Sequence, residues 1–489
     1  MMNATVHRRR AATAALLAGA AMLAGPALAG DRPATPEGAR AVQAFFDRFL
    51  PAPPAGAAPP VSVKPDGQSY VVSADLAALN GLLKAGGADA SYDSATLVVR
   101  LFEQDDGDWR IVQDSFPTVA SRAQDVTSVV RIDNYRQTLV IDPTLAWWVG
   151  GAASADKGNI TSRSPKIDQT IDFGPLAAAF ATTVNADGSV SSTVREEIGD
   201  VAFKMSAIDK DGKAAGSSGR MDKAAFNVGV DGLMSRKLFD LVSLVSAHRT
   251  DLAQHESEVK DLLRPLARPG LRFVEGGEAS RFMIATPMGA IALAGVKFAV
   301  GVSNAGPDSA IDAAIGAEGL SLPLGLAPPG AADLTPSKLD LALTLKGVDI
   351  AAAANTAIDS LHLGGPGPAI SPGDSAKVSA ALIGAGPLRL LLAPSHVVAP
   401  AIDADFQGEM HYTAGKASGA VTVTMRGFDK TMNAVKGLGP EVAMKAMPAV
   451  AMAKGLAKTE SDGALTWLIE VGDDRSLRVN GIPLGKAPG

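Results

Sequence analysis

The sequence contains no cysteine among its 489 residues. This absence excludes thiol catalysis, thiolate metal ligands and disulfide bonds. It also excludes a lipid-modified cysteine as a membrane anchor. Stability must then come from a hydrophobic core, and a chain of this length is able to form one because longer chains bury a larger share of their surface.

The sequence also has no concentrated basic segment. Its formal net charge is −6, from 45 lysines and arginines against 51 acidic residues, and the acids are dispersed. A nucleic-acid partner would require a basic stripe or an arginine-rich patch with aromatic residues, and neither is present. We therefore expect no nucleic-acid binding.

The first 29 residues have the pattern of a secretory signal peptide. A short cationic head at residues 7–10 precedes a compact apolar run over residues 11–25, and the small residues 27–29 follow. This order predicts export with cleavage after Ala29, so that a periplasmic protein begins at Gly30 and carries a charge nearer −9. The apolar run is shorter than the ~20 residues that a transmembrane helix needs.

The remainder of the chain is expected to lack an integral membrane span. Residues 289–306 form the next most apolar segment, but Lys297 interrupts it. Its pattern is more typical of buried β-strands than of a transmembrane helix.

Residues 30–60 are expected to form a helix followed by a linker. Thr35 is a capping hydroxyl and Pro36 suits a first helical turn. Apolar residues then recur at helical spacing, namely Val42, Phe45, Phe46 and Phe49. Proline and alanine dominate residues 51–60, which indicates a stiff extended linker.

Beyond the linker the pattern favours an α+β fold that is mainly antiparallel β. Short alternating segments are separated by Asp-Gly turns at residues 66–67, 106–107, 187–188 and 211–212, which is typical of β-hairpins. We expect a first β-meander over residues 61–267 and a second β-rich half over residues 268–489. Strands with one polar side indicate sheets that bury one face, here long curved sheets covered in part by long helices.

Two long helical segments are predicted. Residues 235–264 carry apolar side chains on one helical face, and residues 428–458 form a second helical region interrupted at residues 437–440. Each follows an alternating strand that ends in glycine and a large apolar residue. The two halves are therefore either related by duplication or alike by chance, and the sequence favours neither reading.

The candidate ligand-lining residues are apolar. Four leucines alternate along one predicted strand, a phenylalanine lies on another, and methionines, which adapt to flexible apolar ligands, gather near the C-terminus. These residues are Leu339, Leu341, Leu343, Leu345, Phe406, Met425, Met432, Met444, Met447 and Met452. Methionine is also common as a filler of ordinary cores, so the pattern alone does not require a ligand.

No catalytic motif was found, and no cofactor is expected. Residues 301–305 (GVSNA) lack the final glycine of a nucleophile elbow, and no phosphate-binding glycine loop is present. The best metal candidate is the pair His248 and His255 with Asp251 and Glu258 nearby. The alternative is that both histidines lie where an apolar helical stripe meets solvent.

The C-terminal third resembles an uncharacterised exported proteobacterial family. The resemblance rests on residues 386–392 (GPLRLLL), 402–408 (IDADFQG), the strand into Gly427 and Phe428, the helical region after it, and 477–485 (LRVNGIPLG). That family is distantly similar to envelope proteins with long curved β-sheets, some implicated in lipid movement. The N-terminal half lacks the family's early Trp-Pro strand and membrane anchor, so no functional residue can be transferred.

The sequence as a whole favours a non-catalytic periplasmic protein that binds or carries an apolar, lipid-like ligand of the cell envelope in a concave β-sheet. One alternative is a structural or interaction protein of the envelope, with a filled core and a protein partner. The other is a metal-assisted hydrolase built on His248 and His255.

Overall fold

A computed structural model describes residues 30–50, 58–81, 89–208, 214–248, 250–286, 288–323, 331–364, 367–384, 386–413 and 416–486. The expected leader (1–29), residues 51–57 of the expected linker and the turn at 211–212 lie outside these ranges. The chain divides into two compact units. The first comprises residues up to Ala215 with Ala225–Asn227 and Met234–Thr250, and the second comprises Gly216–Ala224, Val228–Leu233 and residues from Asp251 onward.

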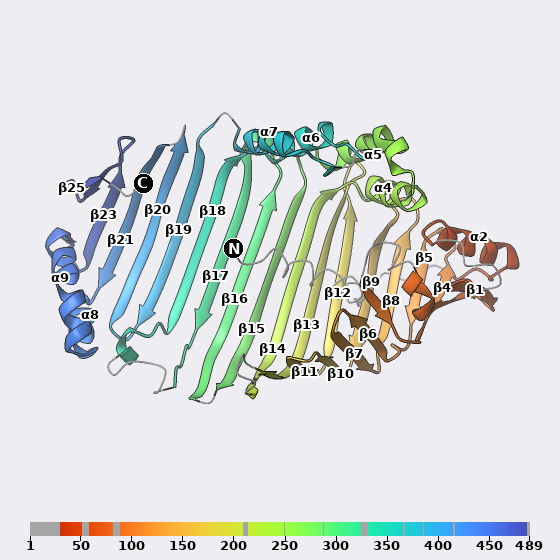
Figure 1. The fold of residues 1–489 in the computed structure, drawn as a ribbon, viewed down its shortest axis with the longest axis horizontal. Helices are drawn as coiled ribbons and strands as arrows, with labels where there is room; N and C mark the ends of the chain where they lie inside the picture. The colour runs from red at the N-terminus through yellow and green to blue at the C-terminus, as the bar shows by residue number, and fades with distance from the viewer. Residues whose placement is uncertain are drawn as a thin grey trace. The chain divides into compact units, whose positions relative to one another are not determined.

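The structure confirms a mainly antiparallel β protein, because all of the strand pairings that it describes are antiparallel (Figure 1). The strands of the first unit are β1 (Val61–Asp66), β2 (Ser69–Asp75), β3 (Ala90–Tyr92), β4 (Thr96–Glu103), β5 (Trp109–Gln113), β6 (Val119–Ala123), β7 (Val126–Asp133), β8 (Arg136–Asp142), β9 (Trp147–Ala155), β10 (Lys157–Arg163), β11 (Ile167–Phe173), β12 (Leu176–Val184) and β13 (Val190–Ile208). β14 (Ala214–Leu233) contributes residues to both units.

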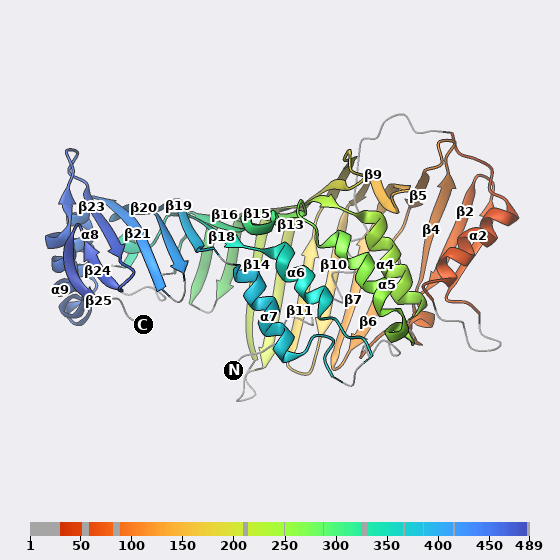
Figure 2. The ribbon, with the colours of Figure 1, turned by 90° about the horizontal axis from the view of Figure 1, so that it is seen from above.

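The first unit contains two groups of strands that meet on β13. β12 pairs with the first half of β13, from Val190 to Ile198, whereas β11 pairs with the second half, from Ala202 to Ala207. From β12 the pairing continues through β9, β8, β5, β4 and β2 to β1, and from β11 through β10, β7 and β6 to β3. The chain alternates between the two groups, which diverge in Figure 2.

Helix α2 (Pro36–Asp47) covers the β1 end of the first group. It begins after the Thr35 cap that the sequence indicates, with the Thr35 hydroxyl accepting a hydrogen bond from the amide of Gly38. Ala39 packs with Tyr70, Val72 and other apolar residues in a core cluster. The short 3₁₀ segment η1 (Ala77–Leu79) and helix α4 (Ser235–Ala247) also belong to this unit.

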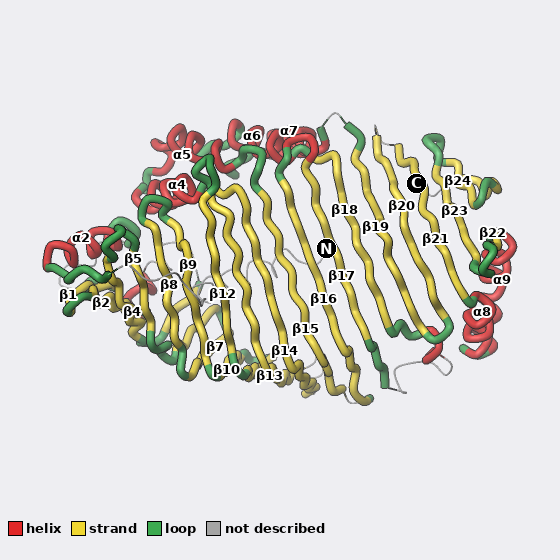
Figure 3. Tube along the Cα trace, turned by 180° about the vertical axis from the view of Figure 1, so that it is seen from behind, coloured by secondary structure: helices red, strands yellow, loops and turns green. Residues whose placement is uncertain are grey.

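The second unit is a meander in which nearly every strand pairs with the next one along the chain (Figures 1 and 3). Its strands are β15 (Arg272–Thr286), β16 (Gly289–Ser303), β17 (Ser309–Glu318), β18 (Lys338–Val348), β19 (Leu388–Ala399), β20 (Ile402–Thr413), β21 (Lys416–Arg426), β22 (Lys458–Thr459), β23 (Leu465–Val471), β24 (Ser476–Val479) and β25 (Ile482–Lys486). β21 pairs with β23, which also pairs with β22 and β24, and β25 pairs with β24.

The helices of the second unit lie mostly at strand ends. They are η2 (Leu252–His255), α5 (Glu256–Leu263), η3 (Arg264–Leu266), η4 (Gly306–Asp308), η5 (Ala331–Leu334), α6 (Ile350–Asp359), α7 (Pro372–Ile383), α8 (Phe428–Gly437) and α9 (Pro440–Leu456). α6 and α7 lie beyond the ends of the neighbouring strands rather than over a sheet face (Figures 1 and 3). None of the described helices is both long and apolar enough to span a bilayer.

Two expectations require correction. Residues 235–264 do not form one helix, because α4 ends at Ala247 and the helical path resumes only at η2 and α5. Asp251 adopts a non-helical conformation there, as an acid at a helix boundary commonly does. In addition, the two units do not divide at residue 267, since residues from Asp251 belong to the second unit. The expected helical region 428–458 is present as α8 and α9, interrupted at residues 438–439.

Candidate functional site

The sheet of the second unit carries four cross-strand rows of side chains that share one face, which we call the apolar face. The strand register places Phe298, Ile315 and Leu341 in one row, and residues two positions away on each strand fall in neighbouring rows of the same face. The apolar face is defined by Phe273, Glu275, Gly277 and Ala279 on β15; Val296, Phe298, Val300 and Val302 on β16; Ile311, Ala313, Ile315 and Ala317 on β17; Leu339, Leu341, Leu343 and Leu345 on β18; Leu390, Leu392, Ser395 and Val397 on β19; Ala404, Phe406, Gly408 and Met410 on β20; Gly419, Val421, Val423 and Met425 on β21; and Leu465, Trp467, Ile469 and Val471 on β23.

The central part of the apolar face is open to solvent. Ile315 is 48% exposed, Val300 43% and Leu343 42%, although each is a large apolar side chain in the middle of a sheet. Phe273, Phe298, Ile311 and Leu390 are exposed as well. Large contiguous apolar patches are uncommon on monomeric proteins and usually mark an interaction surface.

The opposite side of the same strands, which we call the polar face, carries paired charges. Lys297 contacts Asp340 at 2.9 Å across two strands, and Arg389 contacts Glu409 at 2.5 Å. Hydrogen bonding to Lys297 lowers the pKa of Asp340, and hydrogen bonding to Arg389 lowers that of Glu409. These ion pairs make the polar face hydrophilic, so the two faces of the sheet differ sharply in chemistry.

Helices α8 and α9 cover the apolar face at its β23 end. Phe428 of α8 packs against Trp467 with ring centroids 5.8 Å apart, and Val450 of α9 packs in the same cluster. The indole Nε1 of Trp467 donates a hydrogen bond of 2.7 Å to the carbonyl oxygen of Ala453. This end is therefore closed by the protein's own side chains, unlike the strands from β15 to β19.

The predicted ligand-lining residues fall into two groups. Six of them lie on the apolar face, namely Leu339, Leu341, Leu343, Leu345, Phe406 and Met425. The other methionines lie on the covering helices. Met432 and Met447 are half-buried, whereas Met444 is 72% exposed and Met452 60% exposed. The last two do not line the apolar face, because α9 places Val450, Ala453 and Leu456 in the cluster with Trp467.

Sequence reasoning missed the β16 and β17 contribution to this face. Residues 289–306 were expected to form buried strands, and the alternation at Val296, Phe298, Val300 and Val302 does form β16. However, Phe298 and Val300 are exposed. Alternation identifies a face of a strand, but it does not reveal whether any other element covers that face.

The metal candidates are divided between the two units. His248 belongs to the first unit, whereas Asp251, His255 and Glu258 belong to the second. The Nδ1 of His255 lies 3.2 Å from a carboxylate oxygen of Glu258. One imidazole with a carboxylate is an incomplete donor set for a closed Zn²⁺ site, which needs four ligands at about 2.0–2.2 Å.

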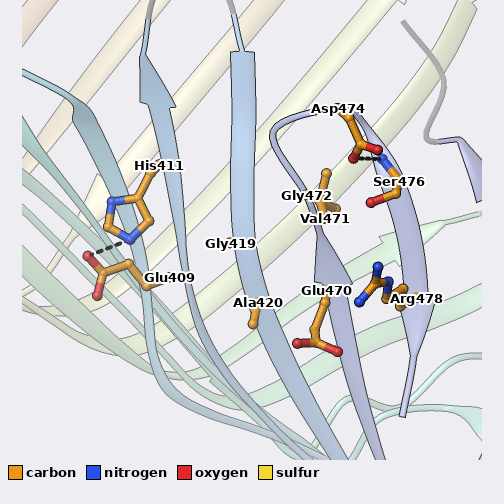
Figure 4. A pocket seen from close by; sticks show the side chains of 10 residues that line it. All are labelled: Glu409, His411, Gly419, Ala420, Glu470, Val471, Gly472, Asp474, Ser476 and Arg478. Carbon is orange, nitrogen blue, oxygen red and sulfur yellow. Dashed lines mark hydrogen bonds and ion pairs between the residues drawn. The ribbon is translucent and has the colours of Figure 1, made fainter. Parts of the chain in front are cut away.

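A polar hollow of about 630 Å³ lies on the polar face between β20 and β24 (Figure 4). Glu409, Glu470 and Arg478 line it from one cross-strand row, and His411 lies 3.4 Å from Glu409. Hydrogen bonding to Ser476 lowers the pKa of Asp474, and Arg389 does the same for Glu409. A general acid at neutral pH requires a raised pKa instead, so the shifts at these two carboxylates do not suit general acid catalysis.

Comparison with known proteins found no relative of this chain. No family model, curated protein or solved structure matches it.

Proposed function

We propose that this protein binds an apolar, lipid-like ligand on the apolar face of its second unit and acts as a non-catalytic carrier or chaperone for it. The proposal rests on one observation: large apolar side chains from five consecutive strands, β15 to β19, are exposed together on one sheet face. On the polar face of the same sheet, charged side chains such as Lys297, Asp340 and Arg389 are present instead.

The energetics of such a surface favour an apolar ligand. Burial of apolar area contributes about 25 cal/mol per Å², so covering about 200 Å² of these side chains would contribute about 5 kcal/mol before the cost of association. Few hydrogen-bond partners are offered on this face, because its side chains are nearly all hydrocarbon. A ligand rich in polar groups would lose its hydration there without compensation.

The cellular setting forms part of the same proposal. The signal-peptide pattern of residues 1–29 would deliver the chain to the periplasm, where lipids move between membranes and a carrier would be useful. We propose three further elements on sequence grounds. They are the resemblance of the C-terminal third to exported envelope proteins, a curved sheet that is partly covered by helices, and a duplication of two related halves.

Lipid extraction followed by native mass spectrometry of the purified protein tests the proposal. We expect copurified or added lipid to bind the wild-type chain and to be lost in Leu343→Glu, which places a charge in the centre of the apolar face. Leu468→Glu is the matched control, because Leu468 has a similar exposure of 38% but lies on the polar face, opposite Thr422.

Two results would contradict a lipid-binding role. The wild-type protein could remain empty when it is mixed with lipid vesicles, or Leu343→Glu could bind as well as Leu468→Glu. Cellular cross-linking from the apolar face to one dominant protein would favour the alternative of an envelope interaction protein, since the same exposed surface also suits a protein partner.

A further inference from the structure

The apolar face contains a single charged side chain. Among the described residues of its four rows, Glu275 on β15 is the only one with an ionisable group. It lies directly opposite Val300 on β16, in the row that continues through Ala313 and Leu343. From this carboxylate on β15, the row is apolar as far as β23.

Glu275 differs from three of the acids on the polar face. Asp340, Asp405 and Glu409 each contact a lysine or arginine at 2.5 to 2.9 Å. By contrast, Glu275 is exposed and makes no ion pair among the residues that the structure describes. An uncompensated negative charge beside an apolar surface is complementary to a ligand that joins a cation to a hydrocarbon chain.

We infer that the ligand is an amphiphile with a positively charged head group, such as an ammonium, held at Glu275 with its hydrocarbon tail lying across β16, β17 and β18. This inference rests on the proposed function and specifies its ligand class. The tail contacts Val300, Ala313 and Leu343 in turn, because these residues follow Glu275 along one row.

The dimensions of the row agree with a membrane lipid. Neighbouring strands lie about 4.8 Å apart, so three steps from β15 to β18 cover about 14 Å. The hydrocarbon core of a bilayer is about 30 Å thick, which gives each leaflet's chains a length of about 15 Å. A tail whose head group contacts Glu275 therefore ends near Leu343.

Binding of matched amphiphiles tests the head-group preference. Isothermal titration calorimetry measures binding to the unmodified chain, so no label has to be placed on the apolar face. Dodecylamine and dodecanoate, titrated at neutral pH below their aggregation limits, have equal tails and opposite charges. We expect dodecylamine to bind at least about threefold more tightly, which is the size of effect that an exposed ion pair commonly gives.

Substitutions at two glutamates of β15 test whether the head-group preference depends on Glu275. Glu275→Gln should abolish the preference for dodecylamine, and Glu275→Lys should reverse it. Glu278→Gln should keep the preference, because Glu278 lies on the polar face opposite Lys297. Equal binding of both amphiphiles to the wild-type chain would overturn the head-group inference alone, whereas binding of neither would overturn the proposed function as well.

Discussion

The indole of Trp467 on β23 and the main chain of Ala453 on α9 are joined by a hydrogen bond of 2.7 Å. This contact fastens the second half of α9 onto the apolar face, together with a hydrogen bond of 2.8 Å from the Asn480 side chain to the carbonyl oxygen of Leu456. Both hydrogen bonds act together with the apolar packing of Phe428 and Val450 against Trp467.

Trp467→Phe should loosen α9 without emptying the core cluster. The phenyl ring retains most of the packing against Phe428 but cannot donate to Ala453, and a hydrogen bond of this kind contributes about 1 kcal/mol. We expect faster amide hydrogen exchange in residues 450–456 and a free energy of unfolding lower by about 1 to 2 kcal/mol. Unchanged exchange in α9 would show that the hydrogen bond does not hold the helix.

Gly419→Ala should destabilise the β20–β21 pairing. Gly419 has φ of +146°, and an added Cβ would lie 2.2 Å from the carbonyl oxygen of Glu409, so the backbone would have to move. We expect a loss of more than about 1 kcal/mol in chemical denaturation. Gly455→Ala is the control, because a Cβ there meets nothing within 4 Å and alanine favours the helix. Equal effects of the two changes would contradict the steric argument.

Glu196→Gln should stabilise the first unit at neutral pH. Burial raises the pKa of Glu196 above its ordinary value of 4.5, so the ionised carboxylate is less favourable in the folded chain than in the unfolded chain. The resulting loss of folding stability is present in full above the folded-state pKa and disappears as the pH falls below 4.5. We expect Glu196→Gln to raise the melting temperature at pH 7 but not at pH 4. A gain of the same size at both pH values would exclude titration as the cause.

Gln43→Leu should expose the outer edge of β1. The Gln43 side chain donates to the carbonyl oxygen of Val61 at 3.1 Å and accepts from the amide of Val63 at 3.0 Å, in place of a neighbouring strand. Unpaired strand edges promote association between chains. We expect the variant to form oligomers in light scattering at concentrations where the wild type does not. Gln43→Glu, which keeps the acceptor for Val63, should show a smaller effect.

Parts of this architecture could be predicted because they depend on local patterns. Alternation at Leu339, Leu341, Leu343 and Leu345 indicates the strand β18 and its one-sided character, and Thr35 followed by Pro36 indicates the start of α2. Likewise, glycine and proline at positions 439 and 440 indicate the break between α8 and α9. Each of these signals is contained within a few residues.

Other features depend on distant parts of the chain and left no local signal. The side-by-side placement of Ile315, Leu341 and Phe298 requires the register of three strands, which no short segment specifies. The exposure of Met444 depends on which side of α9 packs against Trp467. Glu275 was not singled out because a lone acid in an alternating strand usually marks its solvated side, whereas here it follows Phe273 onto the apolar face.

The order of pairing in the second unit has a consequence for how such a protein could change over evolutionary time. Because neighbours in the sheet are, with few exceptions, neighbours in sequence, duplication or loss of one hairpin would add or remove two adjacent strands without rerouting the chain. Each event would change the width of the sheet by about 10 Å. Homologues would then differ in strand number rather than in topology.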